Sequence, residues 1–203
     1  IACALFESKV SGKGQVVDAA IVDGSALLTA MLRYSVDMGA DRGRHANTLD
    51  GGAPFYNVYE TSDGGYVSIG PIEQKFSQEF LARLGIAEDD ELRTRLYDQE
   101  AWPALRDRLT ELFKTKTRDE WSDLLSGTDA CVAPVLDVTE APSHPHNVAR
   151  DAFVELGGVL QPAPAPRFDR TVPEVGRPAP VSGSDTREVL ASLGYDEAKI
   201  DQL

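Results

Sequence analysis

Glu73 is the side chain whose setting in this sequence first suggests chemistry. It follows Gly70 and Pro71 at the end of an apolar run. Glycine lets another backbone or a ligand come close because it has no Cβ, and proline fixes the direction of the chain. We therefore expect the Glu73 carboxylate at a rigid strand end, which suits a functional site. The alternative is that Glu73 simply begins a helix and interacts with its dipole.

The residues before Glu73 predict a β-hairpin that would position it. Residues 56–60 alternate in character, residues 62–65 (Ser-Asp-Gly-Gly) supply turn chemistry, and residues 66–69 resume a β-rich run. This arrangement is typical of two antiparallel strands joined by a tight turn. The hairpin would deliver Glu73 just beyond its second strand.

Other chemically interesting side chains have plainer structural explanations. Asp18 and Asp23 are candidate nucleophiles, but Asp23 can cap the helix that is predicted to follow it. His144 and His146 lie two residues apart with no third histidine or paired cysteine nearby, so turn or interface roles fit them better than zinc binding. Cys131 sits in an apolar run without an adjacent base, which predicts a buried, inert thiol.

Composition excludes several classes of protein. The chain has 203 residues, with 33 acidic against 20 basic side chains and a net charge of −13, which disfavours nucleic acid and anionic membranes as partners. No apolar run reaches the roughly 18 residues of a membrane span. Its two cysteines are too few for a disulfide scaffold, so we expect a reduced, cytoplasmic protein. The chain starts with Ile1 in an apolar segment without a signal-peptide layout, so we expect a longer protein.

The first 54 residues predict an α/β unit followed by a linker. A helix over 1–9 is expected, then a strand over 15–21 and a helix over 24–38. Strand followed by helix favours a parallel sheet. Residues 39–54 are polar and rich in Gly, Arg, Asn and Asp, which is typical of an interdomain linker.

The remaining chain predicts a small α+β unit and an extended tail. Helices are expected over 76–84, 102–113 and 118–125, the last opened by a capping box at Thr117-Arg118-Asp119-Glu120, and a strand over 129–136. Six prolines between residues 159 and 180 favour a stiff, extended return linker. Ser184 is expected to cap a last helix that ends at Gly194.

Several of these motifs together resemble one known family. In chain order they are GKGQVVDAAIVDGSALL, LDGGAPFY, GGAPFYNVYETSDGGYVSIGPIE, TDACVAPVLDVTEAPSHPHNVARDAF and PAPAPRF. They resemble the α-methylacyl-CoA racemases, the racemase branch of the class III coenzyme A transferase superfamily. The matches spread over almost the whole chain, as expected for the C-terminal part, somewhat over half, of such a subunit.

The resemblance implies roles for particular residues. Glu73 matches the family's catalytic glutamate, and Tyr56, Leu49, Gly70 and Ile72 are implied as substrate-binding residues. The reaction would remove the proton α to a 2-methylacyl-CoA thioester and return a proton to the other face of an enolate. Glu73 would hydrogen-bond a histidine base and hold its charge. That histidine and its aspartate partner would lie in the preceding part of the subunit.

The resemblance also implies how coenzyme A and partner chains are bound. Arg42, Arg44 and His45 could meet the phosphates of coenzyme A, although such a cluster is also typical of solvated surface. Coenzyme A would enter as part of the acyl-CoA substrate, with no separate cofactor or metal. Family members form intertwined homodimers, so we expect the same of the full-length protein, with neither nucleic acid nor membrane as a partner.

The expected fold class combines α/β and α+β. Residues 1–50 would be the tail of a Rossmann-like, CoA-binding domain and its linker, residues 51–150 a small α+β domain, and residues 151–203 a Pro-rich return linker with a C-terminal helix. Two alternatives to the racemase remain open. One is a class III CoA transferase, in which an aspartate carries the acyl group. The other is a non-catalytic dimerisation or lid module.

Overall fold

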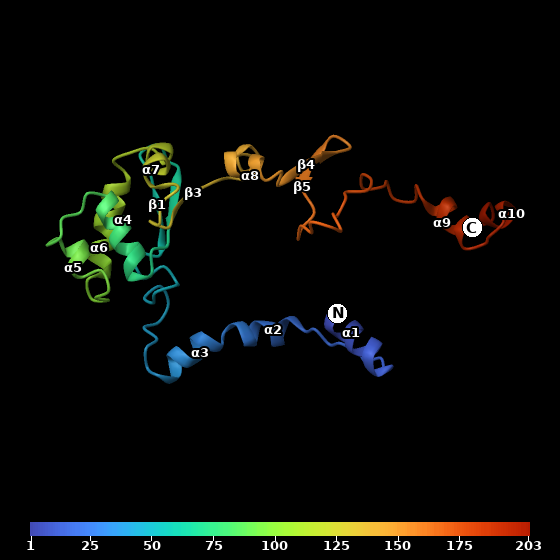
Figure 1. Ribbon diagram of the computed structural model, residues 1–203, viewed down its shortest axis with the longest axis horizontal. Helices are drawn as coiled ribbons and strands as arrows, with labels where there is room; N and C mark the ends of the chain where they lie inside the picture. Colours follow the sequence, from blue (N-terminus) through green and yellow to red (C-terminus); the bar gives the residue numbers. More distant parts are fainter. The chain divides into compact units, whose positions relative to one another are not determined.

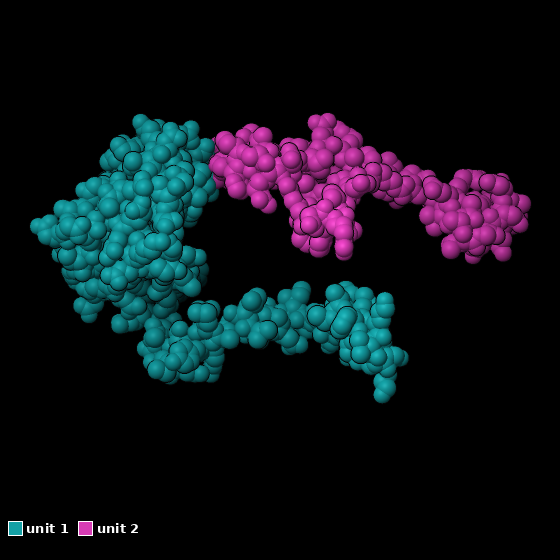
Figure 2. Space-filling view, viewed as in Figure 1, with its two compact units in different colours: residues 1–135 teal, residues 136–203 magenta.

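The structure, a computed structural model, describes all residues from 1 to 203. The chain divides into two compact units, residues 1–135 and residues 136–203 (Figure 2). Helices and small antiparallel sheets occur together in the chain, so the mixed α/β class is as predicted. None of the ten α-helices is long and apolar enough to cross a lipid bilayer. The expected domain boundaries near residues 50 and 150 stay a prediction.

The first unit contains a three-stranded antiparallel sheet in the order β1-β2-β3 (Figure 1). Strand β1 is Asn57–Glu60, β2 is Tyr66–Ile69 and β3 is Val132–Val135. The first two strands form the predicted hairpin, closed where the Thr61 amide donates to the Gly65 carbonyl at 2.9 Å. Strand β3 returns from far along the chain to pair with β2. The central strand β2 therefore ends at Ile69, directly before the Gly70–Glu73 segment.

Four helices accompany this sheet. They are α4 (Gln74–Arg83), α5 (Glu91–Thr94), α6 (Trp102–Phe113) and α7 (Arg118–Leu125). One face of α6 is buried at Trp102, Leu105, Leu109 and Phe113, which confirms the predicted apolar stripe. The predicted capping box at the start of α7 is present between Thr117 and Glu120.

Aromatic side chains dominate the core of this unit. The Phe113 ring stacks on Tyr59 at 5.0 Å between centroids and meets Trp121 edge-on at 5.1 Å. Both core tryptophans use their indole N–H: Trp121 donates to the Phe113 carbonyl at 2.8 Å and Trp102 to the Leu96 carbonyl at 2.9 Å. Every member of the main hydrophobic cluster lies between residues 53 and 130. The sheet that leads to Glu73 is thus supported by a closely packed aromatic core.

The segment before this core is helical, and the strand expected there is wrong. Helices α1 (Ala2–Ser11), α2 (Ile21–Leu28) and α3 (Ala30–Asp37) bury none of their residues. Residues 15–21 pair with no other strand, and Val16 is 95% exposed. An apolar β-rich run becomes a strand only where a second strand satisfies its backbone. Without a partner strand, residues 15–20 stay irregular.

The predicted helix over 24–38 is also revised. It begins earlier, at Ile21, and is divided at Thr29 into α2 and α3. Asp23 therefore lies inside the first turn of α2 and does not cap it; the N-cap is Ala20. A carboxylate in the first turn still interacts favourably with the helix dipole.

The second unit consists of short elements. They are the 3₁₀ helix η1 (Ala141–Ser143), α8 (Pro145–Ala149), β4 (Phe153–Leu156), β5 (Val159–Pro162), α9 (Thr186–Ser192) and α10 (Glu197–Ile200). Strands β4 and β5 form a hairpin, so the stretch predicted as a linker begins as a strand. Proline at the last position of β5 is compatible with a strand end. The expected cap at Ser184 is wrong by one residue, because Asp185 is the N-cap of α9.

Candidate functional site

A cleft of about 650 Å³ opens beside the central strand of the three-stranded sheet. It is lined by Leu49, Gly51, Tyr56, Asn57, Val58, Ser68, Ile69, Gly70, Thr128, Cys131, Val132 and Ala133. The structure therefore brings together three of the four residues expected to bind substrate: Leu49, Tyr56 and Gly70. The fourth, Ile72, packs against the hydrophobic core and does not line the cleft. The lining is mostly apolar with a few hydroxyl, amide and thiol groups, a composition typical of small-molecule sites.

Gly70 and Tyr56 face each other in this cleft. A Cβ placed on Gly70 would lie 3.7 Å from two ring carbons of Tyr56, which is ordinary van der Waals contact. The absence of a side chain at Gly70 thus leaves space beside the aromatic ring. Tyr56 is 39% exposed, so part of its ring remains available to a ligand.

Glu73 occupies the N-cap position of α4, and its side chain is not used as a cap. Its backbone is extended, with φ −74° and ψ 143°, and its carbonyl accepts from the amides of Phe76 and Ser77, both at 2.9 Å. The carboxylate is exposed and has no hydrogen bond or ion pair within the chain. It is therefore accessible to a ligand or to another side chain.

The backbone leading to Glu73 is held by a series of short contacts. The Gly70 amide donates to the Cys131 carbonyl at 2.9 Å, and the Ile72 amide donates to the Gly70 carbonyl at 2.8 Å. The Ile72 carbonyl accepts from the Tyr97 hydroxyl at 3.1 Å. Pro71 is fully buried between these contacts. Glu73 thus follows a turn whose polar backbone groups are paired.

Cys131 corrects the expectation of a buried thiol. It is exposed, adopts φ +53° immediately before β3, and lines the cleft. Partial burial of the sulfur raises the pKa of the Cys131 thiol, and the carboxylates of Glu73 and Asp129 raise that pKa further. The negative charge of Glu73 thus bears on a residue that lines the cleft. A positive φ is costly for a residue with a side chain, and no local pattern in the sequence indicates it.

The loop before the sheet is organised around Asn47, a residue that sequence reasoning missed. Its side-chain amide donates to Asp41 at 3.1 Å, to the Gly43 carbonyl at 2.7 Å and to Asp50 at 2.9 Å. Its side-chain oxygen accepts from the Arg42 amide at 2.9 Å. These bonds close residues 41–50, within the predicted linker, into a compact loop.

Asp50 and Gly52 hold the end of this loop against Asn47. Burial alone would raise the pKa of the Asp50 carboxyl, but hydrogen bonds from Asn47 and the Gly52 amide lower it below its usual value. A Cβ on Gly52 would lie 2.6 Å from the Ala46 carbonyl carbon, so only glycine fits there. The loop carries Leu49 to the cleft as a consequence.

The basic residues of this loop do not line the cleft. The guanidinium of Arg44 donates from Nε to His45 Nε2 at 3.3 Å, and His45 contacts the Asp50 carbonyl through Nδ1 at 2.8 Å. Arg42 takes part through its backbone. Both arginines are exposed, so their side chains are accessible to an anion, and their proposed contact with phosphates stays a prediction.

His144 has a local role at the start of α8. Its Nδ1 atom accepts a hydrogen bond from the His146 amide at 3.3 Å, so it acts as the N-cap of that helix. This agrees with the interpretation of these histidines as turn residues.

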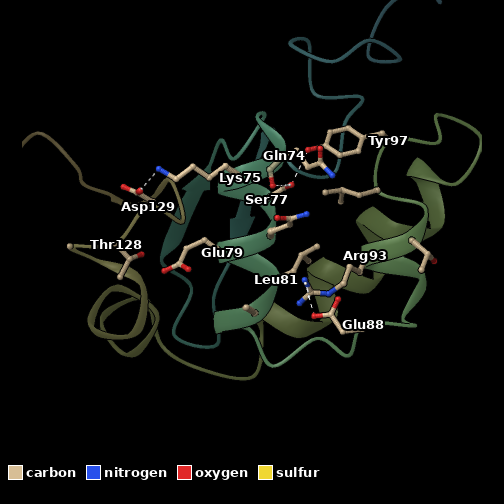
Figure 3. A pocket seen from close by; sticks show the side chains of 15 residues that line it. Gln74, Lys75, Ser77, Glu79, Leu81, Glu88, Arg93, Tyr97, Thr128 and Asp129 are labelled. Carbon is tan, nitrogen blue, oxygen red and sulfur yellow. Dashed lines mark hydrogen bonds and ion pairs between the residues drawn. The ribbon is translucent and has the colours of Figure 1, made fainter.

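A second cavity, of about 1070 Å³, lies along α4 and is shown in Figure 3. Four of its charged groups form two ion pairs: Lys75 with Asp129 at 3.2 Å and Arg93 with Glu88 at 3.5 Å. Ser77 and Tyr97 also line it, with their hydroxyl oxygens 2.9 Å apart. Tyr97 therefore has one side in this cavity and its hydroxyl against the backbone that leads to Glu73.

The sequence is similar to proteins of known name. Residues 1–186 match the CoA-transferase family III. The chain is 42% identical over 207 residues to an alpha-methylacyl-CoA racemase of Mus musculus and 38% identical over 209 residues to one of Homo sapiens. Each match covers 100% of this chain, but 54% of the mouse protein and 53% of the human protein. The chain thus spans about half the length of these relatives.

The fold is similar to that of solved structures. A CAIB/BAIF family protein from Brucella suis matches with a TM-score of 0.68 at 23% sequence identity. The match covers 95% of this chain and 51% of that protein. At this identity the likeness concerns the fold alone.

Proposed function

Because the chain belongs to CoA-transferase family III, we propose that the complete protein is a racemase of 2-methylacyl-CoA thioesters. The observation that carries this proposal is the similarity, over the whole length of this chain, to two proteins named alpha-methylacyl-CoA racemase. The cleft beside Tyr56 and Gly70 supports it, because an acyl chain needs an apolar surface with a few orienting polar groups.

The proposed reaction is proton transfer at the carbon next to the thioester carbonyl. One group removes the α-proton, the electrons move into an enolate, and a second group returns a proton to the opposite face. Such chemistry needs two acid/base groups on either side of the α-carbon and hydrogen-bond donors for the enolate oxygen. The acid/base pair would come from the part of the protein outside residues 1–203.

Glu73 would support this pair. Its carboxylate is exposed and unpaired within the chain, and it stands after a turn whose backbone is hydrogen-bonded. A fixed carboxylate can accept a hydrogen bond from a histidine and stabilise the imidazolium that forms when the histidine takes a proton. Glu73 is thus proposed to orient and charge the base.

Substrate binding would use both the cleft and the Asn47 loop. Leu49 and Tyr56 would contact the acyl part, and the exposed guanidinium groups of Arg42 and Arg44 would meet phosphates of coenzyme A. The full-length protein would act as an intertwined homodimer. Light scattering at micromolar concentration tests that arrangement, and a monomer would contradict it.

The test of the racemase uses a single 2-methylacyl-CoA enantiomer in deuterated water. We expect the complete protein to exchange the α-proton for deuterium and to produce the other enantiomer. The family name keeps CoA transfer as a second candidate. Adding a free carboxylic acid as acceptor distinguishes the two, because a transferase forms a new acyl-CoA and a racemase leaves the thioester intact. Thioester transfer without α-proton exchange would contradict the proposal.

A further inference from the structure

The turn between Gly70 and Glu73 depends on a contact from a distant part of the chain. The Tyr97 hydroxyl donates to the Ile72 carbonyl at 3.1 Å across 25 residues of sequence. Ile72 is the residue directly before Glu73. A displacement of the Ile72 carbonyl would therefore rotate the peptide that carries the Glu73 backbone nitrogen.

The Tyr97 hydroxyl is itself held by Ser77. The two oxygens lie 2.9 Å apart, and either could be the donor. Since a phenol has one hydrogen and Tyr97 gives it to Ile72, both bonds form together only when Ser77 donates to Tyr97. Ser77 is buried, and its hydroxyl also donates to the Gln74 carbonyl at 3.0 Å. The single Ser77 hydrogen is therefore shared between the Gln74 carbonyl and the Tyr97 oxygen.

The ring of Tyr97 is fixed by an aromatic contact. Its centroid lies 5.2 Å from that of Phe55 in an edge-on arrangement, and Phe55 is fully packed in the core. Such pairs have a preferred geometry and add to packing. The rest of Tyr97, which is 50% exposed, borders the cavity along α4, where Ser77 and Gln74 also lie (Figure 3). The hydroxyl is thus aimed by the core although the ring reaches the surface.

We propose that Tyr97 is a positioning residue for Glu73: its hydroxyl, supported by Ser77 and aimed by Phe55, fixes the Ile72 carbonyl and with it the Gly70–Glu73 turn. The expected effect of Tyr97 on turnover rests on the proposed function of Glu73. The expected effect of Tyr97 on the position of the Gly70–Glu73 turn is independent of that function. The Tyr97 side chain does not line the cleft proposed to bind substrate.

The first test is Tyr97→Phe in the complete protein, which keeps the ring and its contact with Phe55. Turnover in α-proton exchange of a 2-methylacyl-CoA should fall about three- to tenfold, the equivalent of losing one neutral hydrogen bond. KM should change less than about twofold, because the substrate cleft is untouched. Ser77→Ala removes the supporting donor and should give a smaller loss in the same direction.

Tyr66→Phe is the matched control. Tyr66 lies on the neighbouring strand β2, is 46% exposed, and its hydroxyl has no partner in the structure. It should match the wild type in turnover and in melting temperature. A Tyr97→Phe variant with the turnover of Tyr66→Phe would overturn the inference.

The Cys131 thiol gives a readout that does not need activity. Partial burial raises the pKa of this thiol most, and the Glu73 carboxylate raises it further, so movement of Glu73 away from it should make alkylation faster at neutral pH. The pH profile of iodoacetamide labelling is measured on the Cys131 peptide by mass spectrometry. Tyr97→Phe should shift the profile to lower pH, in the direction of Glu73→Gln, and Tyr66→Phe should leave it in place.

α-Proton exchange tests the proposed racemase, and iodoacetamide labelling of Cys131 tests the positioning role of Tyr97. Wild-type protein without α-proton exchange contradicts the racemase, and the labelling profile then decides the role of Tyr97 alone. An unchanged profile in Tyr97→Phe, beside a shifted one in Glu73→Gln, would show that the hydroxyl does not hold the turn.

Discussion

The amide of Gly70 donates a hydrogen bond to the carbonyl of Cys131 at 2.9 Å, which joins the end of β2 to the residue before β3. Cys131 reaches this position with φ +53°, so its carbonyl turns toward Gly70 at some conformational cost. The bond extends the sheet by one step beyond the last paired residues, Ile69 and Val132. The route of the chain to Glu73 is therefore determined by two strands together.

Replacing Glu73 by glutamine should slow turnover with little change in substrate affinity. Glutamine keeps the shape and removes the charge, which matters chiefly when a histidine base becomes imidazolium. Loss of one such supporting group costs from about tenfold to about a thousandfold in rate, or about 1.4–4 kcal/mol of barrier. Deuterium exchange at the α-carbon of a 2-methylacyl-CoA measures the effect.

The melting temperature of the same variant tests the competing structural role. A carboxylate that serves only the dipole of α4 would contribute well under about 1 kcal/mol to stability and nothing to turnover. Unchanged exchange with a lowered melting temperature would make Glu73 structural.

A larger side chain at Gly70 should narrow the cleft beside Tyr56. Gly70→Ala places its Cβ 3.7 Å from the Tyr56 ring, in ordinary contact, so the protein should fold normally. Gly70→Val adds two methyl groups in the same space, and KM for a branched acyl-CoA should rise progressively from wild type to alanine to valine. Steady-state kinetics with a short and a long acyl chain measure this series. Equal KM values in all three proteins would remove Gly70 from the substrate site.

Gly52→Ala should destabilise the Asn47 loop. The new Cβ would lie 2.6 Å from the Ala46 carbonyl carbon and 2.7 Å from backbone atoms of Asn47, and overpacking of this kind costs about 1–3 kcal/mol. Thermal unfolding and limited proteolysis between residues 42 and 51 measure the loss. Gly14→Ala is the control, because nothing lies within 4 Å of its Cβ position. Similar results for both variants would contradict the close packing at Gly52.

The ion pair between Asp90 and Arg108 should make stability depend on pH in the acid range. The Arg108 guanidinium, in a bidentate pair with Asp90, lowers the pKa of that carboxyl below its usual value. A depressed pKa in the folded state adds stability above about pH 4, and this stability is lost as the pH falls toward the folded-state value. Unfolding followed by the fluorescence of the core tryptophans should show the loss.

Asp90→Asn provides the matching variant. Asparagine can still cap α5, where Asp90 accepts from the Leu92 amide at 2.8 Å, so the change removes mainly the charge. Its stability should be lower by at most about 1 kcal/mol at pH 7, as expected for a half-exposed pair, and should fall less steeply below pH 4. If the variant lost stability below about pH 4 as steeply as the wild type, the ion pair would have no part in the acid dependence of stability.

Sequence patterns correctly predicted the elements that are determined by residues close together in the chain. The capping box at Thr117 and the buried stripe of α6 depend on spacing within a few residues, and the hairpin of β1 and β2 depends on alternation around a tight turn. The expected strand over 15–21 failed because strand formation needs a partner elsewhere in the chain.

The candidate site could be predicted only in part for the same reason. Leu49, Tyr56 and Gly70 lie in two overlapping motifs of the sequence, and they do meet in one cleft. Cys131 lies immediately before β3, far along the chain, and Tyr97 lies in a loop 25 residues beyond Ile72. Such contacts exist only once the sheet and the aromatic core have formed, and no spacing rule encodes them.

The continuity of the hydrophobic core between residues 53 and 130 has an evolutionary consequence. The sheet, α4 to α7 and the turn that leads to Glu73 all fall within one uninterrupted stretch of chain ending at Val135. Recombination at its two ends would move Tyr56, Gly70 and Glu73 together with the packing that aims them. Chimeras that exchange this stretch between relatives would therefore transfer ten of the twelve residues that line the cleft, together with their packing, in one piece.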